Sequence, residues 1–355
     1  MAWSDRPWVL EGAAVHVSMI GFDRGEEKER SLDGVPVSEI NADLTGAADF
    51  TNAKPLQESS GICLRADEKG GPFDIPNHVA QEMLRVPSNV NGRLNFDVVR
   101  PWITALDVTR RHRHMWIIDF GVDMDEEDAA QYELPFQYVE QHVKPVRLLN
   151  NMPRLREKWW LHRIPGANMR SRLSKLNRYV VTPVTAKYRL FTWIDASTLP
   201  DITVSVFARD DDYFFGVLHS RAHELWALRM GTSLEDRPRY TPTSCFETFP
   251  LPWPPGEEPV DDPVVEEISA AAKHLDELRH NWLNPEGIME AELKKRTLTN
   301  LYNARPSWLQ NAHERLDRAV FAAYGWSAEI SDEDILKNLL ALNQERSKVQ
   351  AQADS

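Results

Sequence analysis

The chain has 355 residues and 42% hydrophobic content, so it is long enough to bury a sizeable core and to divide into two or three units. Only two cysteines and no long apolar run argue against a disulfide framework, a thiolate zinc site and a membrane-spanning helix. The N-terminus lacks a signal-peptide pattern, so we expect a cytoplasmic protein. A net charge of −13 argues at first against a nucleic-acid partner.

The charge is unevenly distributed along the sequence. Positions 144 to 189 hold twelve Lys or Arg residues and a single acidic one, Glu157. From position 257 onward there are eleven basic and nineteen acidic residues. A basic middle can bind phosphate groups while the remainder stays acidic.

The N-terminal part consists of short β-rich runs separated by turns. Residues 14–22 (AVHVSMIGF) predict a buried strand, and residues 32–45 predict a hairpin. After a Gly-Gly-Pro break at 70–72, residues 76–86 predict a short helix. Residues 114–120 predict a strand.

The basic middle begins after a predicted acidic helix. Asp123 is a plausible N-cap of a helix that extends to about position 143, and Pro135 should kink it. A helix is expected around 169–176. The strands expected after it lie near 178–182, 188–194 and 202–208.

Residues 210–253 form the stretch around which the chain is organised. Apolar residues recur at helical spacing over 212–230, where Asp211 or Asp212 can cap the start and Gly231 can end the helix in the left-handed conformation. A polar loop over 232–239 and a strand over 240–249, closed by prolines, complete the stretch. Such a frame suits recognition better than bond-breaking chemistry.

The C-terminal region has a purely helical pattern after a proline-rich linker. Its four predicted helices have the lengths of an antiparallel bundle and cover residues 264–282, 289–302, 306–324 and 332–343.

Seven stretches together resemble one known family. They are GAAVHVSMIGFD (12–23), KGGPFDI (69–75), DVVRPW (97–102), MWIIDFGVDM (115–124), YFFGVLHSRAHELWALRMGT (213–232), RYTPTSCFETFPLPWP (239–254) and ELKKRTLTNLYNARPSWL (292–309). In this order they resemble the C-terminal portion of MmeI-like (type IIL) restriction–modification proteins, which are class I S-adenosylmethionine-dependent adenine-specific DNA methyltransferases.

The resemblance implies an α+β chain with three parts. Residues 1–44 would be a remnant of the methyltransferase domain, with 14–22 as the last strand of its sheet. Residues 45–255 would be a mixed α/β target-recognition domain, and residues 260–350 an all-helical C-terminal bundle.

The catalytic motifs of such a methyltransferase are absent from the sequence. No Gly-rich turn follows a strand to admit the methyl donor S-adenosylmethionine, and no Asn/Asp-Pro-Pro-aromatic loop is present to hold a flipped base. We therefore expect no catalytic residue, no metal and no cofactor in this chain, and a role in recognising double-stranded DNA. Two alternatives remain open: a subunit of a split methyltransferase that needs a separate catalytic polypeptide, and a protein–protein adaptor.

The predicted DNA contacts fall into two groups. The predicted phosphate contacts are Arg110, Arg111, Arg113, Arg170, Arg172, Lys175, Arg178, Lys187 and Arg189. The predicted base readers are Glu235, Asp236, Arg237 and Arg239, because arginine reads guanine and carboxylates accept from cytosine.

Two further patterns resemble metal sites only superficially. His219 and His223 are spaced four apart, but the HExxH order and a third ligand are missing, so packing or hydrogen bonding is the favoured interpretation. The acidic run 123–128 lacks the central glycine of a calcium loop, and an acidic helix start explains it.

Overall fold

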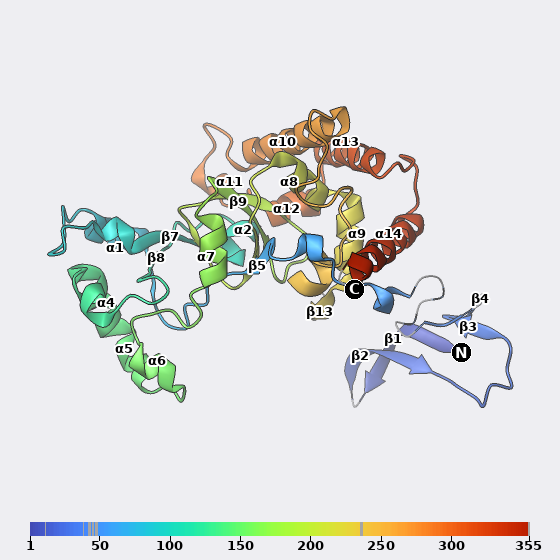
Figure 1. Ribbon diagram of the computed structural model, residues 1–355, viewed down its shortest axis with the longest axis horizontal. Coiled ribbons are helices and arrows are strands. Elements are labelled where there is room, and N and C mark those ends of the chain that lie inside the picture. The colour runs from blue at the N-terminus through green and yellow to red at the C-terminus, as the bar shows by residue number, and fades with distance from the viewer. Residues whose placement is uncertain are drawn as a thin grey trace. The chain divides into compact units, whose positions relative to one another are not determined.

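The computed structural model describes residues 1–10, 12–37, 39–41, 44, 46, 49–234 and 237–353 (Figure 1). The chain forms two compact units, one made of Met1–Leu56 with the segment from Ser331 onward, the other of Gln57–Ile330. Strands and helices are mixed, with helices alone toward the C-terminus, so the α+β prediction is confirmed. Among the described residues, no helix is both long and apolar enough to cross a membrane.

The smaller unit contains a four-stranded sheet in the order β2-β1-β3-β4. Its strands are β1 (Ala2–Leu10), β2 (Ala13–Ile20), β3 (Arg30–Leu32) and β4 (Val35–Val37). The predicted strand 14–22 is present as β2, but it is not buried: its described side chains are half-buried or exposed. The reason is that β2 is an edge strand that pairs only with β1 in this sheet. The predicted hairpin is present as β3–β4; positions 38, 42, 43 and 45 lie outside the described residues.

The last helix, α14 (Asp332–Ala353), belongs to the same unit. The buried side chain of Asn343 accepts a hydrogen bond from the Lys54 amide (2.9 Å) and donates one to the Lys54 carbonyl (2.7 Å). These two bonds attach the helix to the chain just after the short 3-10 turn Phe50–Asn52. The helix is also longer than predicted.

The larger unit contains two four-stranded sheets and a short hairpin, β13-β14. One sheet has the order β10-β9-β12-β5 and is antiparallel throughout; the other has the order β11-β7-β8-β6. The strands of these two sheets are β5 (Cys63–Arg65), β6 (Asp74–Ile75), β7 (Val99–Ile103), β8 (Trp116–Ile118), β9 (Arg178–Pro183), β10 (Thr192–Asp195), β11 (Leu199–Pro200) and β12 (Val204–Phe207). The predicted strands at 114–120, 188–194 and 202–208 are confirmed in shorter form, and the one at 178–182 is confirmed and extends one residue further.

Short helices lie between these strands along the chain. They are α1 (Asn77–Leu84), α2 (Ala105–Thr109), α3 (Glu126–Ala130), α4 (Glu133–His142), α5 (Lys144–Leu148), α6 (Pro153–Glu157) and α7 (Ala167–Leu173). Two predicted helices, 76–86 and 169–176, are confirmed as α1 and α7. The predicted helix 123–143 is wrong as one element: the chain breaks between α3 and α4, Asp125 is at the N-cap, and Pro135 lies in the first turn of α4, where its missing N–H costs no hydrogen bond.

The predicted helix 212–230 is also two helices, α8 (Asp212–His219) and α9 (Arg221–Met230). Ser220 has an extended backbone (ψ 155°), and its hydroxyl accepts from the His223 amide and donates to the Val217 carbonyl. The Arg221 amide donates to Asp317, which lies on a helix 96 residues later (2.7 Å). A break satisfied by such a distant carboxylate leaves no local pattern in the sequence.

The ends of this helical stretch give one confirmation and one correction. Asp211 caps α8 by accepting from the Phe214 amide (2.8 Å), as predicted. Gly231 does not end α9 in the left-handed conformation, because its φ is −79°.

The predictions of a loop over 232–239 and of a strand over 240–249 are both wrong. The first is a hairpin of β13 (Thr232–Leu234) and β14 (Arg237–Arg239). The second contains a π-helical turn over Pro242–Phe246, closed by the Glu247 amide on the Pro242 carbonyl (2.9 Å). The prolines that frame this turn disfavour a central strand, and its apolar side chains Cys245, Phe246 and Phe249 are fully buried.

Four further helices complete the larger unit: α10 (Pro263–Leu283), α11 (Glu290–Leu293), α12 (Leu298–Ala304) and α13 (Ser307–Ala323). The predicted helix 289–302 is therefore split in two. Figure 1 shows α8 running beneath α10 and α13. Gly216 makes this packing possible, since a Cβ there would lie 2.8 Å from Ile268 and 3.2 Å from Leu316.

Candidate nucleic-acid interface

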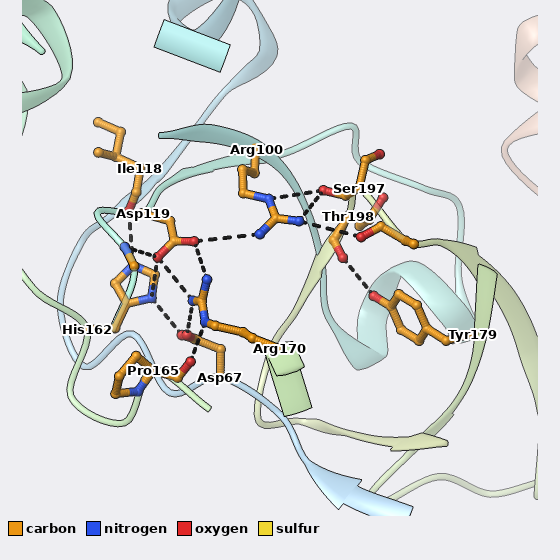
Figure 2. A network of polar contacts seen from close by, with 12 residues as sticks. Asp67, Arg100, Ile118, Asp119, His162, Pro165, Arg170, Tyr179, Ser197 and Thr198 are labelled. Carbon is orange, nitrogen blue, oxygen red and sulfur yellow. Dashed lines mark hydrogen bonds and ion pairs between the residues drawn. The ribbon is translucent and has the colours of Figure 1, made fainter. Parts of the chain in front are cut away.

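A buried network of charged side chains lies between the two sheets of the larger unit (Figure 2). The Arg170 guanidinium on α7 makes two contacts with the Asp119 carboxylate (2.6 and 3.0 Å) and one with Asp67 (2.8 Å). The His162 imidazole donates from Nε2 to the Ile118 carbonyl (2.9 Å), and its Nδ1 lies 2.7 Å from Asp67. Asp67 and His162 have fully buried side chains.

The protonation states of this network follow from its geometry. Burial disfavours the charged form of Asp119, but Arg170 and His162 outweigh it and lower the pKa of the carboxyl. Burial likewise opposes charge on His162, yet Asp67 raises the pKa of the imidazole. The Asp67 and Asp119 carboxyl groups thus face the Arg170 guanidinium and an imidazole whose protonated form is favoured.

The network joins segments that are distant in sequence. Asp67 follows β5 of one sheet, Asp119 follows β8 of the other, and α7 supplies Arg170. In Figure 2, Arg100 on β7 extends the contacts by donating to the Ser197 carbonyl and lying 4.0 Å from Asp119. Sequence reasoning missed Asp67, Asp119 and His162, because no motif relates residues up to about a hundred positions apart.

Arg170 and two other predicted phosphate contacts are therefore engaged within the protein. Arg189 is 8% exposed, and its guanidinium donates to the Thr182 hydroxyl and the Pro238 carbonyl. Arg178 pairs with Asp212 (2.9 Å) and lies 3.7 Å over the Trp193 ring. Arg170 and Arg189 hold elements together, which is a structural role that the sequence pattern did not reveal.

The basic cluster after α2 is also largely engaged in contacts within the chain. Arg113 pairs with the buried carboxylate of Asp107 and also donates to the Thr104 hydroxyl. Burial raises the pKa of Asp107, but the hydrogen bonds that its carboxylate accepts from Arg113 and Thr104 outweigh this effect and lower the pKa to about 2. Arg111 donates to the Leu283 carbonyl at the end of α10 (2.8 Å). Arg110 is exposed.

Further exposed cations of the predicted set lie on and after α7. Arg172 and Lys175 are exposed, and neither makes an ion pair with a residue that the structure describes. Lys187 is exposed as well, although its ammonium donates to Asn303 (2.8 Å).

The hairpin β13–β14 presents two more arginines to solvent. Arg237 and Arg239 are exposed and, being two residues apart on one strand, share one face of the hairpin. Glu235 and Asp236 lie outside the described residues.

The base of this hairpin is firmly anchored. A Cβ on Gly231 would lie 2.7 Å from the Arg239 carbonyl, so only glycine permits the close approach of α9 and β14. The Tyr240 amide donates to the Val184 carbonyl (2.7 Å), and the Arg189 guanidinium lies over the Tyr240 ring. The arginine face therefore projects from a rigid support.

His219 and His223 both act as hydrogen-bonding groups in the core. His223 donates to the Leu218 carbonyl and accepts from the Tyr240 hydroxyl (3.0 Å), and burial lowers its pKa to about 3. His219 accepts from Arg279 on α10 (2.6 Å), with burial and Arg279 holding the pKa of the imidazole well below its usual value. Within the described ranges no group of three or more His, Cys, Asp or Glu side chains is arranged to hold a metal ion.

Two family models match most of the chain. The model described as "MmeI, target recognition domain" matches residues 122–253, and the one described as "MmeI, C-terminal domain" matches residues 260–350. The first covers α3 to α9, the hairpin and the π-helical turn, and the second covers the helices that follow.

Two known proteins are similar to this chain. DNA methyltransferase A of Bacillus subtilis (strain 168) is 32% identical over 156 residues, which are 42% of this chain and 15% of that protein. The solved structure of the type IIL restriction–modification enzyme MmeI in complex with DNA aligns with 98% of this chain at a TM-score of 0.73 and 18% identity, a level that establishes a shared fold. The aligned part spans 46% of the MmeI chain, so this chain covers less than half the length of both similar proteins.

Proposed function

Because the chain belongs to the MmeI family, with its target recognition domain followed by its C-terminal domain, we propose that it is the DNA-recognition part of an adenine-N6 methyltransferase. In this proposal the methyltransferase serves a restriction–modification system. The observation that carries the proposal is the pair of adjacent family domains, in a sequence without a methyl-donor turn or an NPP-aromatic loop. S-adenosylmethionine would bind elsewhere in the complete enzyme.

The exposed cations give the proposal its contacts. Arg110, Arg172 and Lys175 would bind phosphates, and the arginine face of the hairpin would read base edges. Arg170 and Arg113 would support these contacts indirectly, since using them on DNA would remove an ion-pair partner from the buried carboxylates Asp67, Asp119 or Asp107. Arg189 would do so through its hydrogen bonds to Thr182 and the Pro238 carbonyl.

Duplex binding as a function of salt tests the phosphate contacts. Replacing Arg172 and Lys175 by alanine should weaken binding to all sequences alike and reduce the log–log salt slope by about 2, at roughly 0.9 per contact. The control is Lys337→Ala, an exposed cation on α14 outside the basic segment. Equal slopes for the double variant and the control would contradict this assignment.

Specificity is tested at the hairpin. Exchange of Arg237 or Glu235 should alter preference at one base position by about 1–3 kcal/mol with little general loss of affinity. Competition selection on randomised duplexes, with the methyltransferase portion supplied, measures the preference. An unchanged preference at every position would place the readers elsewhere.

A split enzyme remains the second candidate. In that case the chain alone should not transfer methyl groups, but mixing it with a separate polypeptide that carries the donor site should restore transfer to duplex DNA. Methyl incorporation by the pure chain would contradict both candidates.

A further inference from the structure

The helices α5 and α6 and the loop between them, residues 144–158, form the end of a helical arm in the larger unit. In Figure 1 this arm, with α4 at its base, projects away from α8 and α10. We refer to residues 148–152 as the α5–α6 tip. None of its residues is among the predicted DNA contacts.

The tip exposes large apolar side chains. Leu149 is 87% exposed and Met152 47% exposed, with Leu148 and Val146 also exposed beside them. Single exposed apolar side chains are ordinary, but a contiguous group at the end of an arm marks an interaction site.

The tip is also rigid, because polar groups fix its backbone. The Asn150 side chain accepts from the Met152 amide (2.9 Å), and the Arg156 guanidinium donates to the Asn150 carbonyl (2.8 Å). The buried Arg147 side chain on α5, directly before the tip, donates to the Lys69 and Leu161 carbonyls. The apolar side chains are therefore presented in one arrangement, and ordering them costs little on binding.

The surroundings of the tip are cationic. Arg154, Arg156 and Lys158 are exposed, and Glu157 is the one acidic residue between positions 144 and 163. Burial lowers the pKa of the Arg147 guanidinium to about 10, and the nearby charges of Arg154 and Arg163 act in the same direction. Arg154 also lines an open pocket of about 420 Å³ beside the start of α7, together with Arg65.

We propose that the α5–α6 tip inserts Leu149 and Met152 between base pairs from the minor groove of duplex DNA, while Arg154, Arg156 and Lys158 bind the flanking phosphates. A rigid apolar wedge with adjacent cations has the chemistry needed to unstack a base step and bend the duplex. The cations beside the apolar tip favour duplex DNA as its partner, because DNA offers apolar base stacks between rows of phosphates, which the surface of an acidic protein does not. This inference rests on the proposed function and adds a second contact to it.

The test uses the full chain, a duplex obtained by competition selection, and fluorescent labels at both duplex ends to report bending by energy transfer. Leu149→Ala should reduce affinity roughly tenfold, which is about 1.4 kcal/mol, because the inserted apolar surface is lost, and it should reduce the bend. Met152→Ala should act in the same direction. The control is Met289→Ala, an exposed apolar position in the acidic helical region, which should change neither quantity.

The charge contribution is tested separately with Lys158→Ala, which should lower the salt slope by about 1 and leave the bend in place. All variants are at exposed positions and should leave the fold unchanged; melting temperatures equal to that of the parent chain verify this.

The outcomes distinguish this inference from the proposed function. If the parent chain binds and bends DNA, and the Leu149 and Met152 variants bind it more weakly and bend it less, the inference stands. Binding and bending that are the same in the parent and both variants overturn the wedge alone and assign the tip to a protein contact. A parent chain that binds no duplex at any salt concentration overturns the proposed function and the inference together.

Discussion

At the scale of single residues, neighbouring cations of the basic segment have different physical environments. Arg170 and Arg172 lie two positions apart on α7, so they point to different sides of the helix. Arg170 faces the interior and balances Asp67 and Asp119, whereas Arg172 faces solvent. The charge count of the sequence treats them alike.

Replacing each by methionine separates these roles. Arg170→Met should destabilise the protein by about 3–5 kcal/mol, because two carboxylates would stay buried with one cation between them. Arg172→Met, the matched control on the same helix, should change stability by less than about 0.5 kcal/mol while weakening DNA binding. Urea unfolding curves measure the first effect; equal midpoints for the two variants would contradict it.

Asp317 on α13 provides a pH-dependent test. Burial, with a contribution from Glu224, raises the pKa of its carboxyl to about 7, against the opposing effects of the Arg221 amide and guanidinium. A group with a raised pKa in the folded state contributes stability below its unfolded pKa and loses it as pH rises through the folded pKa.

Asp317→Asn should therefore stabilise the protein relative to the parent chain at pH values above about 7. This gain should vanish at acidic pH, because a neutral Asp317 and an asparagine both accept from the Arg221 amide. Melting temperatures of both proteins across pH measure the difference, and Asp261→Asn at an exposed position controls for the substitution itself. A gain that is constant with pH would refute the argument.

At the scale of elements, the hairpin β13–β14 depends on backbone contacts rather than on its own short strands. Two strands of three residues are marginal by themselves. Their stability comes from the close approach at Gly231, the pairing of Thr185 with Arg239 and the hydrogen bond from Arg189 to the Pro238 carbonyl.

Gly231→Ala should displace the hairpin, since its Cβ would lie 2.7 Å from the Arg239 carbonyl and 2.8 Å from the Ala227 carbonyl. We expect a loss of about 1–3 kcal/mol and faster hydrogen exchange at the amides of β14. Leu228→Ala, at an exposed position of the same helix, should leave this exchange unchanged. Unaltered protection of β14 in the Gly231 variant would show that the contact is not limiting.

At the scale of the whole chain, the two regions matched by the family models share one core within the larger unit. The buried helix α8 comes from the first region, and α10 and α13 come from the second. Contact between Gly216 and the side chains of Ile268, Ala272 and Leu316 brings these helices together.

A double-mutant cycle between Gly216→Ala and Ile268→Ala tests this shared core. Each single change should destabilise, one by crowding and one by leaving a cavity, but the pair should cost less than the sum by about 0.5–3 kcal/mol. Additive effects would contradict the contact. Combining Ile268→Ala with the exposed Leu228→Ala should give additive effects and serves as the control.

The amino-acid sequence by itself determined the local segments and the family. The sequence predicted the strands β9 and β12, the helices α10 and α13, and Asp211 as a cap, because each of these depends on neighbouring residues. The spaced stretches from 12 to 309 carried the resemblance that the family models match. Domain boundaries near positions 45 and 255 stay predictions.

Only the tertiary structure decided which charges are accessible and where long segments break. Arg189 is buried and Arg170 is largely covered, because Asp67, Asp119 and the Pro238 carbonyl are brought to them by distant parts of the chain. Helix 212–230 breaks at Ser220 because Asp317 on α13 receives the Arg221 amide. Asp67, Asp119 and Asp317 lie dozens of positions from the arginines that they contact, so local spacing in the sequence cannot reveal these interactions.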